Sequence, residues 1–147
     1  MPTVTILEAS RRSGLSEPTL RYYEEAGLIG PIARDDRSGH RRYTPEDLAT
    51  LEVLTCLRAV GVGIEEMRVY LANRARGRAA SADQRDLLLR HAARIEAEMA
   101  AQQARLGYLK LKAALWDARD RGDAEAEADA GRRLPEAIAD LQITPLK

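Results

Sequence analysis

The chain has a single cysteine, Cys56, among its 147 residues. An intramolecular disulfide is therefore excluded, as is a zinc site built from several cysteines. The two histidines, His40 and His91, have no partner at a spacing that would build a metal site. The sequence accordingly predicts neither a bound metal nor a cofactor.

The chain also lacks an excess of charge of either sign and lacks long hydrophobic runs. Its 23 lysines and arginines balance 23 aspartates and glutamates, so any basic surface for nucleic acid must be local. No apolar segment approaches the length of a membrane span, and the N-terminus lacks the apolar core of a signal peptide. No nucleophile with a nearby base and no pair of carboxylates stands out. We therefore expect a cytoplasmic protein with no membrane partner that is not an enzyme.

Two short helices joined by a tight turn are predicted near the N-terminus. Residues 5–13 have apolar side chains at helical spacing, and Gly14 follows where a helix ends. Ser16 suits an N-cap, Pro18 suits a first turn, and the sequence TLRYYEEAGL supplies a second helix that Gly27 closes. This pattern is typical of a helix-turn-helix.

The second helix and the loop after it carry the candidate DNA contacts. A recognition helix turns its N-terminal end toward base edges in the major groove. The loop is rich in arginine, with Ser38 and Gly39 suited to a sharp turn between extended arms. One such arginine is usually a solvated surface charge, but the combination predicts contacts to phosphates or a narrow minor groove. The predicted DNA-binding residues are Glu17, Thr19, Arg21, Tyr22, Tyr23, Arg34, His40, Arg41, Arg42 and Tyr43.

The stretches SGLSEPTLRYYEEAGLI and GHRRYTPEDLATLEVLTCLRAVGVGIEEM are similar to the head of the mercury-resistance regulator (MerR) family, over residues 4 to 75. Two departures lie at the loop tip, with His40 where the family often has tyrosine and Ser38 where it often has asparagine. The resemblance implies a sequence-specific transcriptional regulator that distorts promoter DNA for RNA polymerase in response to an effector. The alternative is an excisionase-like architectural DNA-binding protein, which has a related winged head.

Cys56 lies in the helix expected after Thr44, which carries two apolar strips. It shares the second strip with Val53 and Val60, so that helix is predicted to pack on two sides. By resemblance, a branch of the family that responds to aldehydes and other electrophiles has a lone cysteine at the equivalent point. Cys56 is therefore either a sensor thiol for an electrophile or a small buried hydrophobic residue.

An apolar seam with alternating spacings of four and three residues runs through the second half of the chain. No other segment is long enough to cover it, so a second copy is the predicted partner, and a two-fold dimer suits a palindromic operator. The resemblance implies that the paired helices are antiparallel. Gln102, midway along, either meets its own mate and fixes the register or is merely tolerated. The seam residues are Leu88, Ala92, Ile95, Met99, Gln102, Leu106, Leu109, Ala113 and Trp116.

A second apolar stripe, which includes Tyr108 and Leu115, needs a cover from the tail or from the head of another copy. In the tail a small amphipathic helix is expected to begin at Pro135. The aromatic residues Tyr70, Tyr108 and Trp116 either belong to the core or line a site for an apolar cation, so a small-molecule effector also stays open.

The predicted fold is mainly α: a winged helix-turn-helix head, a long antiparallel coiled-coil dimerisation helix and a short C-terminal tail. The predicted boundaries are 1–75 for the head, 76–84 for a linker, 85–118 for the coiled-coil helix and 119–147 for a tail linked to the effector.

Overall fold

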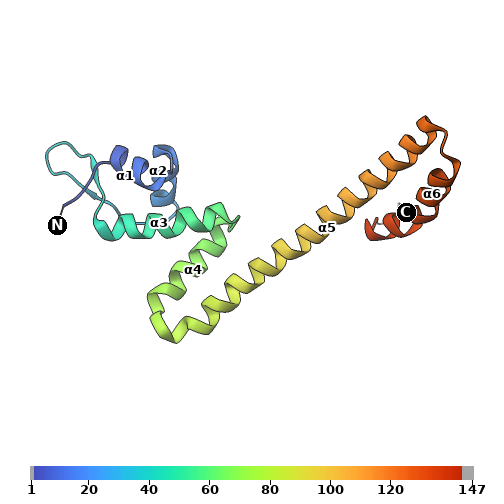
Figure 1. The fold of residues 1–147 in the computed structure, drawn as a ribbon. Coiled ribbons are helices and arrows are strands. Elements are labelled where there is room, and N and C mark those ends of the chain that lie inside the picture. Colours follow the sequence, from blue (N-terminus) through green and yellow to red (C-terminus); the bar gives the residue numbers. More distant parts are fainter. Residues whose placement is uncertain (1, 144–147) are drawn as a thin grey trace. The chain divides into compact units, whose positions relative to one another are not determined.

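A computed structural model describes residues 2–143, and helices dominate it (Figure 1). The chain divides into two compact units, Met1–Leu88 and Leu89–Lys147. The elements in chain order are α1 (Ile6–Ser13), α2 (Glu17–Glu25), β1 (Ala33–Arg34), β2 (Arg41–Arg42), α3 (Pro45–Ala59), α4 (Ile64–Arg76), the 3-10 helix η1 (Gly77–Ala80), α5 (Ser81–Arg121) and α6 (Ala124–Asp140).

The helix-turn-helix predicted from the sequence is confirmed in the first unit. Thr5 caps α1 by accepting from the Glu8 backbone N–H, and Gly14 ends it with a φ of 77°, a conformation that glycine adopts without steric cost. Ser16 caps α2 by accepting from the Thr19 backbone N–H. Each cap satisfies a backbone group that a helix end leaves unpaired, so both helices begin where the sequence predicts.

The wing is a short antiparallel ribbon in which Ala33 pairs with Arg42 and Arg34 with Arg41. An isolated bridge between Val4 and Tyr43 continues the pairing onto the N-terminal segment. The chain ahead of α1 therefore anchors the base of the wing.

The helices α3 and α4 complete the core of the head. A reciprocal capping box between Thr44 and Asp47 starts α3. Leu51, Leu54 and Leu57 are buried on one face of this helix. The prediction that α3 is covered on both sides is not met within the single chain, because Val60 is exposed on the second strip and so is Cys56.

The linker predicted at residues 76–84 has helical structure instead. Helix α4 extends to Arg76, η1 follows, and α5 begins at Ser81. The sequence RARGRAASAD shows no apolar periodicity, but tertiary contacts organise it: Ala80 is buried, and Gln84 is hydrogen-bonded to α4.

In the second unit, α6 packs along the C-terminal half of α5 (Figure 1). Leu115, Ala118 and Ala130 are buried, so the tail covers the second stripe of α5. Pro135 lies inside α6 rather than at its start, which corrects the sequence-based prediction. The helix begins earlier because Asp123 caps it, accepting from the Ala126 backbone N–H, and alanine-rich sequence follows.

No helix within residues 2–143 is both long enough and apolar enough to cross a membrane.

Candidate nucleic-acid interface

The first turn of α2 presents a polar face. The Thr19 hydroxyl lies 2.8 Å from the Ser16 hydroxyl, so it belongs to the helix cap. The Glu17 carboxylate lies 3.7 Å from the Arg21 guanidinium, one helical turn on. Arg21 and Tyr22 are exposed, the latter by 51%, while Leu20 is buried. The α2 surface thus offers a guanidinium and a phenol beside a capped helix end.

Two of the predicted DNA contacts, Tyr23 and Tyr43, pack in the core of the head. Tyr43 is 0% exposed and Tyr23 is nearly as buried. The backbone of Tyr43 pairs with Val4 in both directions, which turns its side chain into the core. Burial, with the nearby Glu24 charge, raises the pKa of the Tyr43 phenol. The core encloses the Tyr43 side chain, which contradicts the prediction that Tyr43 contacts DNA. Tyr23 packs in the core but also lines a surface depression with Tyr22 and Arg58, so its contact with DNA stays a prediction.

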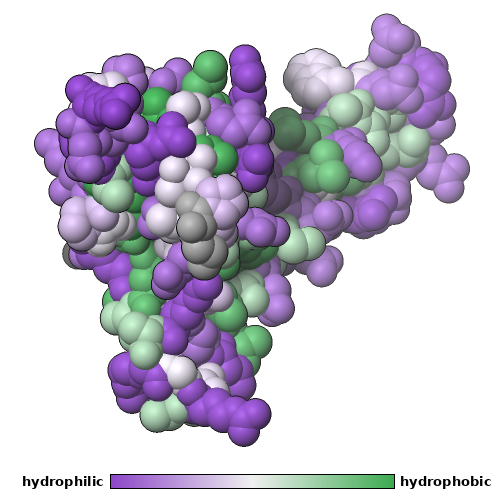
Figure 2. Space-filling view, turned by 90° about the vertical axis from the view of Figure 1, so that its left-hand side faces the viewer, coloured by the Kyte–Doolittle hydropathy of each residue, from purple (hydrophilic) through white to green (hydrophobic). Residues whose placement is uncertain are grey.

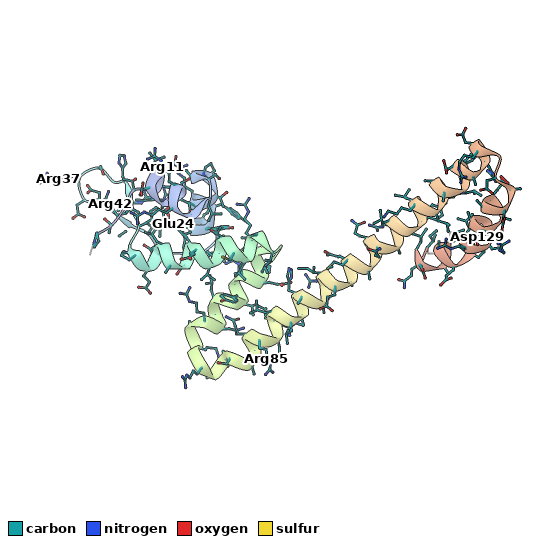
Figure 3. The ribbon with its side chains drawn as sticks, in the orientation of Figure 1. Arg11, Glu24, Arg37, Arg42, Arg85 and Asp129 are labelled. Carbon is teal, nitrogen blue, oxygen red and sulfur yellow. The ribbon has the colours of Figure 1, made fainter. Side chains whose placement is uncertain are left out.

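Asp35 holds the tip of the wing. Its carboxylate accepts from the backbone N–H groups of Arg37 and Ser38, both at 2.9 Å. These hydrogen bonds hold the pKa of Asp35 below its ordinary value. Arg34 Nη1 donates to the Gly39 carbonyl oxygen at 3.1 Å, while Arg37 extends away from the tip (Figure 3). Asp35 is not among the residues predicted from the sequence, although an aspartate ahead of Ser-Gly is a recognisable turn signal.

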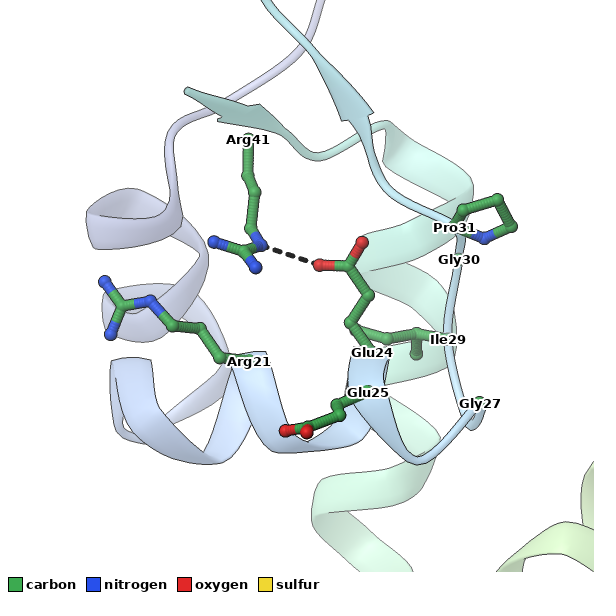
Figure 4. A pocket seen from close by; sticks show the side chains of 8 residues that line it. All are labelled: Arg21, Glu24, Glu25, Gly27, Ile29, Gly30, Pro31 and Arg41. Carbon is green, nitrogen blue, oxygen red and sulfur yellow. Dashed lines mark hydrogen bonds and ion pairs between the residues drawn. The ribbon is translucent and has the colours of Figure 1, made fainter. Parts of the chain in front are cut away.

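Glu24 connects the recognition helix to the wing. One carboxylate oxygen lies 2.6 Å from Arg41 Nε, and the other accepts from the Ile32 backbone N–H at 3.1 Å. Figure 4 shows this ion pair beside a cavity of about 580 Å³ that Arg21 also lines. Charge-assisted hydrogen bonds of this kind are stronger than neutral ones. Glu24 carries no local signal in the sequence, because its partners lie in the wing.

The remaining wing residues divide into anchored and free side chains. Arg42 Nε donates to Thr3 Oγ1 at 3.0 Å and its Nη2 to the Thr3 carbonyl oxygen at 3.3 Å. His40 is exposed.

On the other side of α2, Tyr22 and Arg58 line one depression of about 270 Å³ together with Gly63. Hydrophilic side chains cover much of the face of the head shown in Figure 2.

The Glu24 bridge predicts a pH-dependent stability. Desolvation acts to raise the pKa of Glu24, but the hydrogen bonds from Arg41 and Ile32 and the charges of Arg41 and Arg34 lower it overall. A lowered pKa stabilises the fold above the ordinary value of 4.5, and this contribution is lost as pH falls through the lower folded-state value. Glu24→Gln should therefore reduce the free energy of unfolding at pH 7 by about 1–2 kcal/mol. Urea titrations at several pH values measure this difference, which should vanish in acid.

Glu25→Gln is the matched control, because Glu25 is exposed on the neighbouring position of α2. This variant should stay close to the wild type at every pH. A Glu24→Gln difference that persists undiminished in acid, where the Glu24 carboxylate is protonated, would contradict the role of the carboxylate charge.

The seam residues of α5 are uncovered in the single chain. Met99 is 66% exposed and Leu109 is 64% exposed, and Trp116 is open apart from a stacked Arg119 guanidinium at 4.7 Å from the ring centroid. Large apolar side chains exposed in a row mark an interaction surface. Within residues 2–143, no group of three or more histidine, cysteine, aspartate or glutamate side chains is placed to hold a metal ion.

A capped helix-turn-helix with an exposed polar face, next to a ribbon that carries arginines, defines a winged-helix DNA-binding protein. Residues 4–74 match the family described as MerR HTH family regulatory protein, and residues 48–112 match the description MerR, DNA binding. The chain belongs to the MerR family of DNA-binding transcriptional regulators. Members of this family are dimeric and act by distorting promoter DNA.

Individual relatives agree with this assignment over most of the chain. The Heavy metal-dependent transcription regulator 2 of Rhizobium meliloti (strain 1021) is 38% identical over 121 residues, which cover 82% of this chain and 81% of that protein. The crystal structure of a putative MerR family transcriptional regulator from Listeria monocytogenes is 32% identical in sequence, with a TM-score of 0.63. The match covers 88% of this chain and 98% of that one. HiNmlR, a MerR family regulator lacking the sensor domain and bound to promoter DNA, is 27% identical with a TM-score of 0.61. The match covers 85% of this chain and 95% of HiNmlR. The excisionase-like alternative gains no support from these relatives.

Proposed function

We propose that two copies of this chain pair through the α5 seam and bind a palindromic promoter operator, one head to each half-site. The observation that carries this proposal is the exposed polar face of α2 beside a wing braced by Glu24 and Asp35. A protein that binds promoter DNA must share a compartment with the DNA, so this proposal supports the predicted cytoplasmic location.

The side chains of the head have separate tasks in this proposal. Arg21 and Glu17, on the first turns of α2, read base edges, because an exposed guanidinium can bind a guanine in two places. Arg37 and His40, exposed at the wing, meet phosphates or the minor groove. Arg41 and Arg42 mainly hold the wing in place, since Glu24 and Thr3 occupy their guanidinium groups.

Arg21→Ala tests base reading, with Arg42→Ala tested in parallel. We expect Arg21→Ala to weaken operator binding by about 1–3 kcal/mol and to relax specificity at one position of each half-site. Arg42→Ala should weaken binding to all sequences alike. Gel-shift titrations with a short palindrome at fixed salt measure both effects.

Arg132→Ala is the control, because Arg132 is an exposed arginine of α6 paired with Asp129. Its removal changes the net charge equally but leaves the head intact. Equal binding by Arg21→Ala and Arg132→Ala would refute the assignment of α2 as the recognition helix.

The regulatory step in this proposal is a distortion of the operator that lets RNA polymerase use the promoter. Smooth bending of a site of this length costs on the order of several kcal/mol, which the phosphate contacts of two heads must offset. An effector favours the distorting state by binding it more tightly than the resting state.

Cys56 is the candidate for sensing an electrophile, and its exposure on α3 supports that function over burial as an inert residue. We expect an aldehyde or iodoacetamide to modify this thiol in the native protein, since access is one condition of thiol reactivity. Mass spectrometry of the intact protein detects the adduct, and a promoter fusion measures induction. Cys56→Ala should abolish both; induction by aldehydes or oxidants that survives in this variant would end the sensing proposal.

A further inference from the structure

A chain of side-chain amides joins α4 to the first turn of α5. Asn73 Nδ2 donates to Gln84 Oε1 at 3.1 Å, and Gln84 Nε2 donates to the Tyr70 carbonyl oxygen at 3.0 Å. Asn73 is only 8% exposed. Asparagine is unfavourable inside a helix, because its side chain competes for backbone hydrogen bonds. Its place in α4 is therefore better explained by the contact with Gln84 than by helix formation.

These amides lie at a corner of the chain. Gly77, with a φ of 67°, caps the C-terminal end of α4, and η1 leads into α5 with Ala80 buried. The corner and the start of α5 belong to the same compact unit as the head, which extends to Leu88. The first turns of α5 are thus part of the DNA-binding unit.

Hydrogen bonds restrict such a corner more than apolar contacts do. The hydrophobic effect is non-directional, so burial of apolar surface does not by itself select one angle between two helices. A hydrogen bond weakens steeply when its distance or angle departs from the ideal, and a buried amide without a partner is costly. Rotation of α5 against α4 would strain both amide hydrogen bonds together.

We propose that Asn73 and Gln84 are positioning residues for operator recognition: their amide chain holds the α4–α5 corner at one angle and so sets the half-site separation that a dimer accepts. This inference rests on the proposed dimeric binding of an operator. Neither residue touches DNA in this role. Each added base pair moves a half-site along the duplex and rotates it about the helix axis, so a fixed corner rejects altered separations.

The test uses palindromes with the preferred spacing and with one base pair more or fewer. The double variant Asn73→Leu/Gln84→Leu replaces both amides by apolar side chains, which can be nearly neutral for stability. Arg76→Ala is the matched control, since it removes an exposed ion pair with Asp83 at the same corner. Fluorescence anisotropy measures affinity for each spacing, and sedimentation checks that every variant remains dimeric.

We expect the wild type and Arg76→Ala to prefer the correct spacing by at least about tenfold, and the double variant to reduce this preference to about twofold. Affinity of the double variant for the preferred spacing should change much less than its discrimination. The single variant Asn73→Leu should unfold at a lower temperature than the double variant, because it leaves Gln84 without its partner.

Two outcomes would overturn the inference while leaving the proposed function standing. One is a double variant that discriminates between spacings as the wild type does. The other is an equal loss of affinity for all spacings, which would show a purely structural role. A wild type that binds no palindrome would instead refute the proposed function itself, and the inference with it.

Discussion

The Leu109→Glu variant is expected to sediment as a monomer and to lose most of its affinity for a palindromic operator. Leu109 lies in the seam of α5 and is exposed in the single chain. In a two-fold dimer the substitution would bury an unpaired carboxylate at two symmetric places, each at a cost of several kcal/mol. Loss of pairing removes the second head, so at least about a hundredfold loss of operator affinity should follow. Analytical ultracentrifugation and gel-shift titration measure the two effects.

A control and a rescue make this result specific. Ala101→Glu adds the same charge on α5 at an exposed position away from the seam, and it should leave the dimer intact. Ile95 and Leu109 lie at equal distances along the chain from Gln102. In an antiparallel pair centred on Gln102, residue 95 of one copy lies opposite residue 109 of the other. The double variant Ile95→Lys/Leu109→Glu should therefore form dimers again, because it places opposite charges together. A double variant that stays monomeric would contradict this register, and a dimeric Leu109→Glu would contradict the seam.

Gly30→Ala is expected to destabilise the head by at least about 1–3 kcal/mol, the cost of a left-handed backbone for a residue other than glycine. The φ of Gly30 is 83°, and a Cβ there would come within 2.5 Å of the Ile32 backbone nitrogen. That nitrogen donates to Glu24, so the clash would also disturb the bridge between α2 and the wing. Thermal unfolding measures the loss, and operator affinity should fall with it because the wing is displaced.

Gly39→Ala separates the cost of the left-handed backbone from the cost of the clash with Ile32. Gly39 has a similar φ of 73°, but a Cβ there meets nothing within 4 Å. This control carries only the backbone strain, so Gly30→Ala should be clearly the less stable of the two. Equal stability of the two variants would show that the contact with Ile32 relaxes without cost.

Local signals predicted the helices of the head well. Ser16 and Thr44 cap helices as expected, and Gly14 ends α1. Caps and glycine turns act within a few residues of the chain, so their effect is visible in the sequence. At Pro135 the local signal misled, because the cap at Asp123 starts α6 earlier.

The candidate site was only partly predictable. Arg21, Tyr22 and His40 are exposed as expected, whereas Tyr23 and Tyr43 are buried. A tyrosine combines an apolar ring with a polar hydroxyl, so its residue type is compatible with either a core or an interface. Only the pairing of Tyr43 with Val4, far away in the sequence, turns that side chain inward.

The sequence by itself determined the family, the capped helix-turn-helix and the heptad seam, because short-range spacing and periodicity carry all three. The tertiary structure alone decided which arginines are anchored, since the partners of Arg41 and Arg42 are Glu24 and Thr3. It also decided that residues 76–84 form an ordered corner through the amides of Asn73 and Gln84. The physical reason is the same in each case: a hydrogen bond between residues far apart in the chain depends on packing, which no local pattern encodes.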